Sequence, residues 1–143
     1  DPALICRPIS IQKTYTYENG YQRTVDLIRS GVKFDAIFAI ADSIAIGCLR
    51  ALRDQGIRVP EDVAVIGFDG LEIGSYLTPA LSTLQQPVNE MAEASMHALL
   101  GLLEEREKEV AAKLAGGSTE QPKEKTAKFQ QVFPGELKIR ESC

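Results

Sequence analysis

The chain has 143 residues and a net charge of −4, with 44% apolar and 25% charged residues. An acidic chain does not grip a phosphate backbone by itself, which leaves DNA binding to a basic domain attached elsewhere. No apolar run approaches the roughly 20 residues that a membrane-spanning helix needs. Cys6, Cys48 and Cys143 are spaced too widely for a metal site and suit reduced thiols. We therefore expect a cytoplasmic protein without a metal or other cofactor.

The first quarter of the chain predicts two strands and a helix. Residues 3–6 are apolar and predict a strand, and residues 9–16 predict a loop. Residues 18–30 predict a helix that Gly31 ends, because apolar residues recur at helical spacing. Residues 35–40 predict a second strand, buried on both faces.

A second helix is expected over residues 43–55, with the Asp42 carboxylate as its N-cap. Gly47 lies inside this helix, where glycine costs about 1 kcal/mol relative to alanine. We therefore expect another element to approach Gly47 closely. The predicted inner face consists of Ala45, Cys48, Leu49 and Leu52.

The stretch VPEDVAVIGFDG, residues 59–70, contains the most informative strand of the sequence. Residues 63–66 are four consecutive apolar residues and predict a strand that is buried on both faces and ends before Gly67. The glycines around Asp69 predict a sharp turn that displays its carboxylate at the carboxyl end of the strand. Ligands bind at that edge in open parallel sheets.

The next elements are a helical turn over residues 71–76 and a fourth strand over residues 81–85. Pro87 suits the first turn of a long helix over residues 88–109. The stripe expected to be buried along this helix is Val88, Ala92, Ser95, Leu99, and Leu102 or Leu103.

The last part of the chain changes in composition. Residues 104–128 are charged and small and predict a mobile insertion or a frayed helical extension without a core of its own. Residues 129–133 and 137–140 predict a short closing pair of strands.

Alternating strands and helices with short connections predict an α/β fold with an open, mostly parallel, doubly wound sheet and helices on both faces. This topology brings Tyr15, Ala41, Asp42, Asp69 and Gln86 to one rim of the sheet. An aromatic ring, a carboxylate and an amide suit a small polar ligand with an apolar face, such as a sugar or a nucleobase.

Three stretches of the chain resemble one known family. They are FDAIFAIADSIAIGCLRALRDQGIRVPEDVAVIGFDG, YLTPALSTLQQPVNEMAEASMHALL and the late ELKIRES. Together they closely resemble the carboxyl-terminal subdomain of lactose-repressor-type transcription regulators, the LacI/GalR family. The resemblance covers nearly the whole chain except residues 104–128.

The resemblance implies that residues 1–143 form the second lobe of a periplasmic-binding-protein-like sensor. Such regulators carry an N-terminal helix-turn-helix, bind a small effector between two lobes and act as homodimers or tetramers. The helix-turn-helix and the first lobe are absent here, so this chain is either an excised fragment or a truncated protein. We expect it neither to bind operator DNA nor to hold an effector fully.

The resemblance also implies roles for individual residues. Asp69 matches the acidic residue that bonds the effector, Tyr15 the aromatic residue that stacks on it, and Gln86 a polar residue of the same cleft. Ala41-Asp42 stands where the family often has Asn-Asp, a departure that weakens the case for a simple hexose. The family's dimer contacts fall on Ile46, Arg50, Ile73, Tyr76 and Leu77.

Each of these residues also has a simpler interpretation. Asp69 suits an ordinary turn, Asp42 a helix N-cap, and Tyr15 and Gln86 surface positions. The apolar residues of the implied interface also suit a core or an ordinary surface.

Two other functions compete with a regulator. A sugar-binding component of an uptake system shares the fold, although free cysteines and the ELKIRES ending favour the regulator. An enzyme on a doubly wound sheet is disfavoured, because the sequence has no nucleophile elbow, no phosphate-binding glycine loop and only one histidine, mid-helix His97. We therefore expect a non-enzyme.

Overall fold

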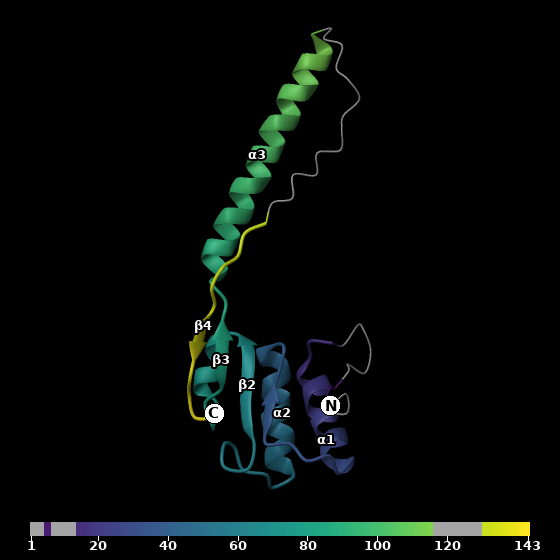
Figure 1. Ribbon diagram of the computed structural model, residues 1–143, viewed down its shortest axis with the longest axis vertical. Helices are drawn as coiled ribbons and strands as arrows, with labels where there is room; N and C mark the ends of the chain where they lie inside the picture. Colours follow the sequence, from purple (N-terminus) through teal and green to yellow (C-terminus); the bar gives the residue numbers. More distant parts are fainter. Residues whose placement is uncertain (1–4, 7–13, 116–129) are drawn as a thin grey trace. The chain divides into compact units, whose positions relative to one another are not determined.

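The computed structural model describes residues 5–6, 14–115 and 130–143, which divide into two compact units. The first unit contains Asp1–Gln86 and Gly135–Cys143, and the second contains Pro87–Pro134. The first unit holds a sheet with the helices that pack on it, and the second holds one long helix (Figure 1).

The sheet of the first unit has four strands in the order β1 (Ala36–Phe38), β2 (Ala64–Asp69), β3 (Ser82–Gln85) and β4 (Glu136–Lys138). β1 and β3 both pair with β2 in parallel, whereas β4 joins the edge of β3 antiparallel. The predicted α/β fold with a mostly parallel open sheet is confirmed. Because β2 and β3 are parallel, their carboxyl ends meet at one edge of the sheet (Figure 1).

Two helices pack beside this sheet, close to where the sequence predicts them. α1 (Tyr17–Arg29) is capped by the Thr16 hydroxyl, which accepts the Asn19 N–H. It ends next to Gly31, which adopts a φ of 73° that suits glycine. α2 (Asp42–Asp54) packs against β2, and α1 packs against α2.

The helices α1 and α2 approach each other through glycines. A methyl group on Gly47 of α2 would overlap the Tyr17 carbonyl oxygen of α1 and lie 2.7 Å from the Tyr21 nitrogen. A methyl group on Gly20 of α1 would overlap the Ile44 carbonyl of α2. The predicted close approach at Gly47 is confirmed, and its partner is backbone rather than a side chain.

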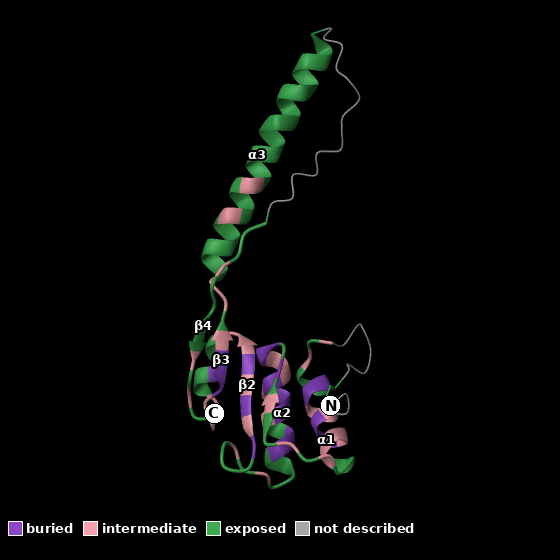
Figure 2. Cartoon of the chain, in the orientation of Figure 1, coloured by how far each residue is buried: buried purple, intermediate pink, exposed green. Residues whose placement is uncertain are grey.

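The core lies between α2 and the sheet, where Figure 2 shows the buried residues. Three of the four predicted inner residues of α2, namely Ala45, Cys48 and Leu52, are buried, and Leu49 is half-buried. The buried cluster also contains residues from β2 and from the segments next to the strands. Its members are Ala39, Ala45, Leu52, Val63, Val65 and Leu81.

Two strand predictions need correction. The central strand β2 does not end before Gly67 but continues to Asp69, because Gly67, Phe68 and Asp69 pair with β3. Burial alternates along β2, so it is not buried equally on both faces. β1 is also not buried on both faces: Phe38 is 64% exposed, and Ile37 is half-buried.

The C-terminal segment forms hydrogen bonds with both β2 and the start of β3. The buried Ser142 hydroxyl donates to the Val65 carbonyl at 2.6 Å and accepts the Ser82 N–H at 2.8 Å. The Ser142 backbone bonds the Ala80 carbonyl and the Val65 N–H at 3.0 and 2.7 Å. Ser142 thus satisfies backbone groups near the amino ends of β2 and β3, next to the residues where these two strands begin to pair with each other.

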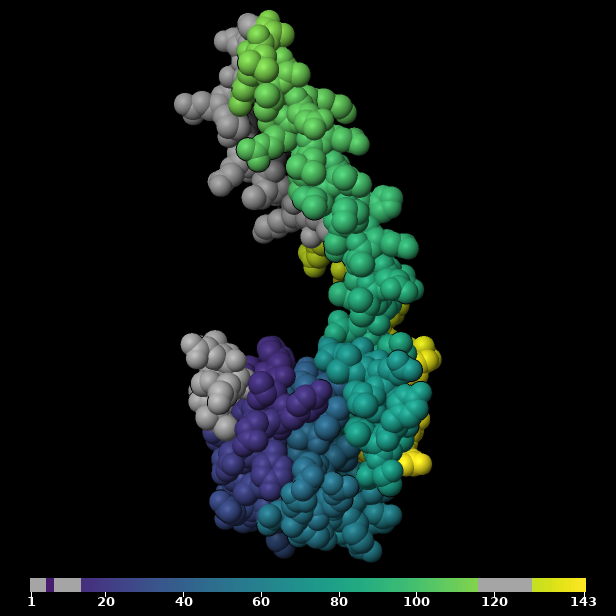
Figure 3. Space-filling model, turned by 180° about the vertical axis from the view of Figure 1, so that it is seen from behind, coloured from purple at the N-terminus to yellow at the C-terminus, as the bar shows by residue number. Residues whose placement is uncertain are grey.

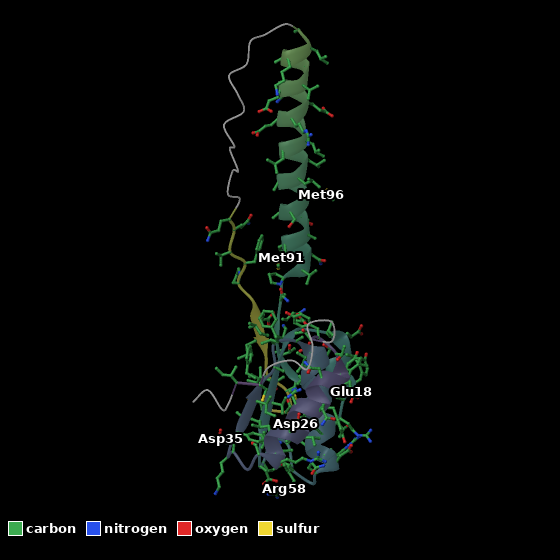
Figure 4. All side chains as sticks on the ribbon, turned by 90° about the vertical axis from the view of Figure 1, so that its right-hand side faces the viewer. Glu18, Asp26, Asp35, Arg58, Met91 and Met96 are labelled. Atoms are coloured by element: carbon green, nitrogen blue, oxygen red, sulfur yellow. The ribbon has the colours of Figure 1, made fainter. Side chains whose placement is uncertain are left out.

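The second unit contains α3 (Val88–Leu114), whose side chains are not buried. The predicted buried stripe is therefore wrong: Val88, Leu99, Leu102 and Leu103 are each about half exposed or more. Met91 and Met96 also lie on this exposed helix (Figure 4). The apolar residues on one side of a helix become buried only when a second surface packs against them. The described residues of this unit provide no such surface.

Other predictions for the ends and the insertion have mixed outcomes. Residues 3–4 lie outside the described residues, and Ile5 and Cys6 are not in a strand. The predicted loop over 9–16 is described only from Thr14 onward. The first part of 104–128 is helical up to Leu114, whereas 116–129 lie outside the described residues, so the mobile insertion stays a prediction.

The prediction of a closing pair of strands is half correct. Residues 130–133 form no strand, and Phe129 lies outside the described residues. β4 instead pairs with β3, with Leu137 opposite Leu84. Among the described residues, no helix is both long and apolar enough to cross a membrane.

We expect the three cysteines to differ in reactivity. Burial raises the pKa of the Cys48 thiol, whereas Cys6 and Cys143 are exposed. A raised pKa leaves less thiolate at a given pH, and the thiolate is the nucleophile. An aromatic disulfide reagent should label two thiols rapidly in the folded protein and the third only after urea is added. Rapid labelling of Cys48 in native buffer would contradict this packing.

Candidate functional site

The rim at the carboxyl ends of β2 and β3 brings together two of the predicted ligand residues. Asp69 is the last residue of β2, and Gln86 follows β3 directly. Gln86 Nε2 donates to Asp69 Oδ1 at 2.9 Å, and the Gln86 N–H donates to the Asp69 carbonyl at 3.2 Å. Both residues are partly exposed. A carboxylate held by an amide is therefore present at this edge.

Asp42, the first residue of α2, lies near this rim and is fully buried. Its Oδ2 accepts the Gly70 and Leu71 N–H groups at 3.0 and 2.6 Å, and its Oδ1 accepts the Thr83 hydroxyl at 2.7 Å. The N-cap prediction is wrong, because Ala41 takes that position without a side-chain bond and Asp42 is the first helical residue. The carboxylate instead joins the start of α2 to the end of β2 and to β3.

Thr83 is the residue of this rim that the sequence analysis missed. Its hydroxyl donates to Asp42 and also lies 3.3 Å from the Gly70 nitrogen, and its side chain is fully buried. The available signal was a pair of small polar residues, Ser82 and Thr83, between Leu81 and Leu84 in the predicted strand. Buried hydroxyls usually have partners, so such a pair indicates bonds to other elements.

The remaining rim residues are Tyr15 and Ala41. The Tyr15 side chain is 64% exposed, and its carbonyl oxygen accepts the Ser43 hydroxyl at 2.9 Å. This bond ties the segment before α1 to the first turn of α2. Ala41 is buried and offers no polar side-chain atom. Within residues 14–115 and the other described stretches, no group of acidic, histidine and cysteine side chains could hold a metal ion.

The implied dimer residues surround a different surface. A hollow of about 900 Å³ is lined by Ile46, Arg50, Tyr76 and Leu77, together with residues of α1 and residues near Arg58. Ile73 is half exposed but does not line it. Figure 3 shows the atoms of α1 and α2 side by side in the first unit. Four of the five implied residues are thus adjacent in space.

Ion pairs surround this hollow. Arg50 Nε pairs with Asp54 at 2.9 Å, and the Tyr21 hydroxyl donates to the same carboxylate at 3.3 Å. The Arg50 guanidinium holds the pKa of Asp54 below its usual value. Arg58 pairs with Asp62 at 2.6 Å and lowers the pKa of that carboxyl to about 2. Arg50 and Arg58, two of the cations that line the hollow, are therefore paired within the chain.

The comparisons with known proteins agree on one family. The model of the periplasmic binding protein-like domain matches residues 5–143. The HTH-type transcriptional regulator AscG of Escherichia coli is 40% identical over 90 residues, which are 63% of this chain and 27% of AscG. The chain therefore spans less than a third of the length of this curated relative.

Solved structures extend the similarity to nearly the whole chain. A sugar-binding transcriptional regulator of the LacI family from Escherichia coli, complexed with phosphate, is 34% identical with a TM-score of 0.67. It aligns with 91% of this chain, which covers 40% of the regulator. A LacI family regulator from Arthrobacter in complex with lactose is 32% identical with a TM-score of 0.66, over 89% of this chain and 42% of its own.

The family match assigns residues 5–143 to the periplasmic-binding-protein-like class, and a mostly parallel sheet with polar residues at the carboxyl ends of its central strands fits that class. Within that class, the chain belongs to the LacI family and matches the C-terminal part of its effector-binding domain. The relatives are transcription regulators and not enzymes. They also give no support to the alternative of an uptake component.

Proposed function

We propose that this chain is the effector-sensing and dimerisation lobe of a cytoplasmic LacI-type transcription regulator. The observation that carries the proposal is the bonded pair of Asp69 and Gln86 at the shared carboxyl edge of β2 and β3. Ligands bind at such edges in open α/β sheets. A small effector would bind there, between this lobe and a second lobe elsewhere in the protein.

The rim favours an effector that carries hydrogen-bond donors, either sugar-like or nucleobase-like. Asp69 Oδ1 is already bonded to Gln86, and Oδ2 accepts no hydrogen bond from the described residues, so Oδ2 can accept a hydroxyl or ring N–H. The exposed Tyr15 ring can stack on an apolar ligand face. Ala41 contributes no polar side-chain atom, and the carboxylate of the buried Asp42 is bonded to Gly70, Leu71 and Thr83. The lactose complex of the Arthrobacter relative supports the sugar class.

Regulation would follow from a difference in affinity. If the effector binds one arrangement of the two lobes more tightly than the other, it shifts the population toward that arrangement. A dimer of such sensors would pass the change to DNA-binding domains elsewhere in the protein, as a coupling free energy between the two sites.

The test is operator binding by the full-length protein, measured by fluorescence anisotropy with and without single sugars and nucleobases. We expect one compound of these classes to change operator affinity in a saturable, dose-dependent way. Typical coupling free energies correspond to changes of about 5–150-fold. A panel of both classes that leaves operator affinity unchanged would overturn the proposal.

Dimerisation is proposed through the hollow that Ile46, Arg50, Tyr76 and Leu77 line, with Ile73 beside it. Tyr76 is 74% exposed, and aromatic side chains are enriched where interfaces bind most strongly. We expect Tyr76→Asp to raise the dimer dissociation constant of the full-length protein by at least about tenfold in analytical ultracentrifugation.

A control for this prediction is Val132→Asp, since Val132 is 84% exposed and lies outside the hollow. It should leave the dissociation constant unchanged. Equal sedimentation of wild-type protein and Tyr76→Asp at every concentration would place the interface elsewhere.

A further inference from the structure

The backbone of Asp69 is held in an unusual conformation. Among the described residues, Asp69 is the one non-glycine residue with a positive φ, at 129°. Residues with a side chain rarely adopt this region, and a residue held there is strained. Such a conformation persists only where the surroundings enforce it.

The two residues after Asp69 show what enforces it. The Gly70 and Leu71 N–H groups both donate to the same oxygen, Oδ2 of Asp42. Two consecutive amides on one charged oxygen fix the direction in which the chain leaves β2. On its other side, Asp69 is paired with Gln85 in the sheet. Asp69 therefore lies between two anchored segments.

Asp42 is itself held in place by its surroundings. Its other oxygen, Oδ1, accepts the Thr83 hydroxyl, and its position in the first turn of α2 favours a negative charge. Gly67 provides the space, since a methyl group there would overlap Asp42 Oδ1. A buried carboxylate with three donors is rigid, because any movement would leave a charged group unsatisfied.

We propose that Asp42 is a positioning residue for the effector site: seated by Thr83, it holds the Gly70 and Leu71 amides and so presents the Asp69 carboxylate to the ligand. Without this anchor, Asp69 relaxes toward an extended conformation, and its carboxylate leaves the Gln86 amide. The inference rests on the proposed function only in assigning a ligand to Asp69. The link from Asp42 to the Asp69 backbone is testable without any ligand.

The experiment is NMR on the full-length protein with selectively labelled aspartate, glycine and leucine. A φ of 129° gives a small coupling between the amide and α protons, whereas an extended residue gives a large one. Wild-type protein should show the small coupling at Asp69. Asp42→Asn and Thr83→Val should show a larger, averaged coupling, and the Leu71 amide should exchange about tenfold faster or more.

Matched variants separate positioning from general stability. Thr83→Ser keeps the hydroxyl and should restore the small coupling that Thr83→Val loses. Ser82→Ala removes the neighbouring buried hydroxyl, which accepts the Arg140 N–H at 2.8 Å and does not touch Asp42. It should lower stability and leave the Asp69 coupling small. Gly67→Ala should act like Thr83→Val, because its methyl group displaces Asp42. Thr83→Val and Thr83→Ser suffice if Asp42→Asn does not fold.

The outcomes distinguish this inference from the proposed function. A small coupling retained in Thr83→Val and Asp42→Asn would overturn the positioning role, whatever Asp69 binds. An equal change in Ser82→Ala would overturn it as well. If the coupling changes as expected but Asp69→Ala does not alter the response to effector, Asp42 positions Asp69 and the ligand assignment fails instead.

Discussion

Replacing Gly47 by alanine should destabilise the protein by about 3 kcal/mol. The added methyl group would overlap the Tyr17 carbonyl oxygen and lie 2.7 Å from the Tyr21 nitrogen. Both atoms are backbone atoms of α1, so the clash is relieved only if the two helices move apart. Alanine favours helix over glycine by about 1 kcal/mol, and this gain is too small to offset the lost packing.

Urea denaturation followed by circular dichroism measures this effect. Gly101→Ala in α3 is the matched control, because a methyl group at Gly101 would meet no atom of another described segment within 4 Å. That variant should be unchanged or slightly more stable. A Gly47→Ala protein with wild-type stability would show that α1 and α2 do not pack through their backbones at this position.

Ser142→Ala should cost about 2–4 kcal/mol, the second large effect that the structure predicts. The substitution removes the hydroxyl that bonds the Val65 carbonyl and the Ser82 N–H, and it leaves both backbone groups buried without a side-chain partner. Each unsatisfied buried group costs about 1–3 kcal/mol. Alanine is smaller than serine by one oxygen atom, so steric strain does not contribute.

The midpoint of urea unfolding is again the measurement. Ser75→Ala removes a serine hydroxyl that bonds the Glu72 carbonyl at 2.7 Å on the exposed surface, and it should change stability far less. Equal midpoints for the two variants would mean that the C-terminal segment does not join β2 to β3 as described.

The fold was predictable from local patterns because its helices and strands follow local rules. α1 and α2 have helical periodicity and glycine stops, and their ends differ from the predicted ones by only one residue. The glycine inside α2 also predicted a close neighbour, since an unfavourable residue in a helix needs a packing reason. Such signals act within a few residues and can be read from the chain directly.

The end of β2 was not predictable in the same way. Gly67, Phe68 and Asp69 resemble a turn, but they continue the strand because β3 offers partners for pairing. The exposure of α3 is a similar case, because whether an apolar stripe is buried depends on what packs against it. In both places, the contacts that an element makes with the rest of the protein decide its structure or burial, and local sequence does not.

Asp42 shows the same limit within the site. From sequence, its carboxylate suits an N-cap before a helix. Its partners Gly70 and Thr83 instead lie 28 and 41 residues further along the chain. Asp69 and Gln86 were easier to predict, because each lies where a parallel strand ends and the ends of adjacent parallel strands meet.

The measurement that tests an effector site at this rim most directly is the effector dose–response of operator binding by full-length Asp69→Ala protein. We expect at least about a tenfold higher effector concentration for the half-maximal response, with operator affinity in the absence of effector unchanged. Glu72→Ala, at an exposed residue three positions away, should respond like wild type. A response of Asp69→Ala that matches wild type at every concentration would contradict the assignment.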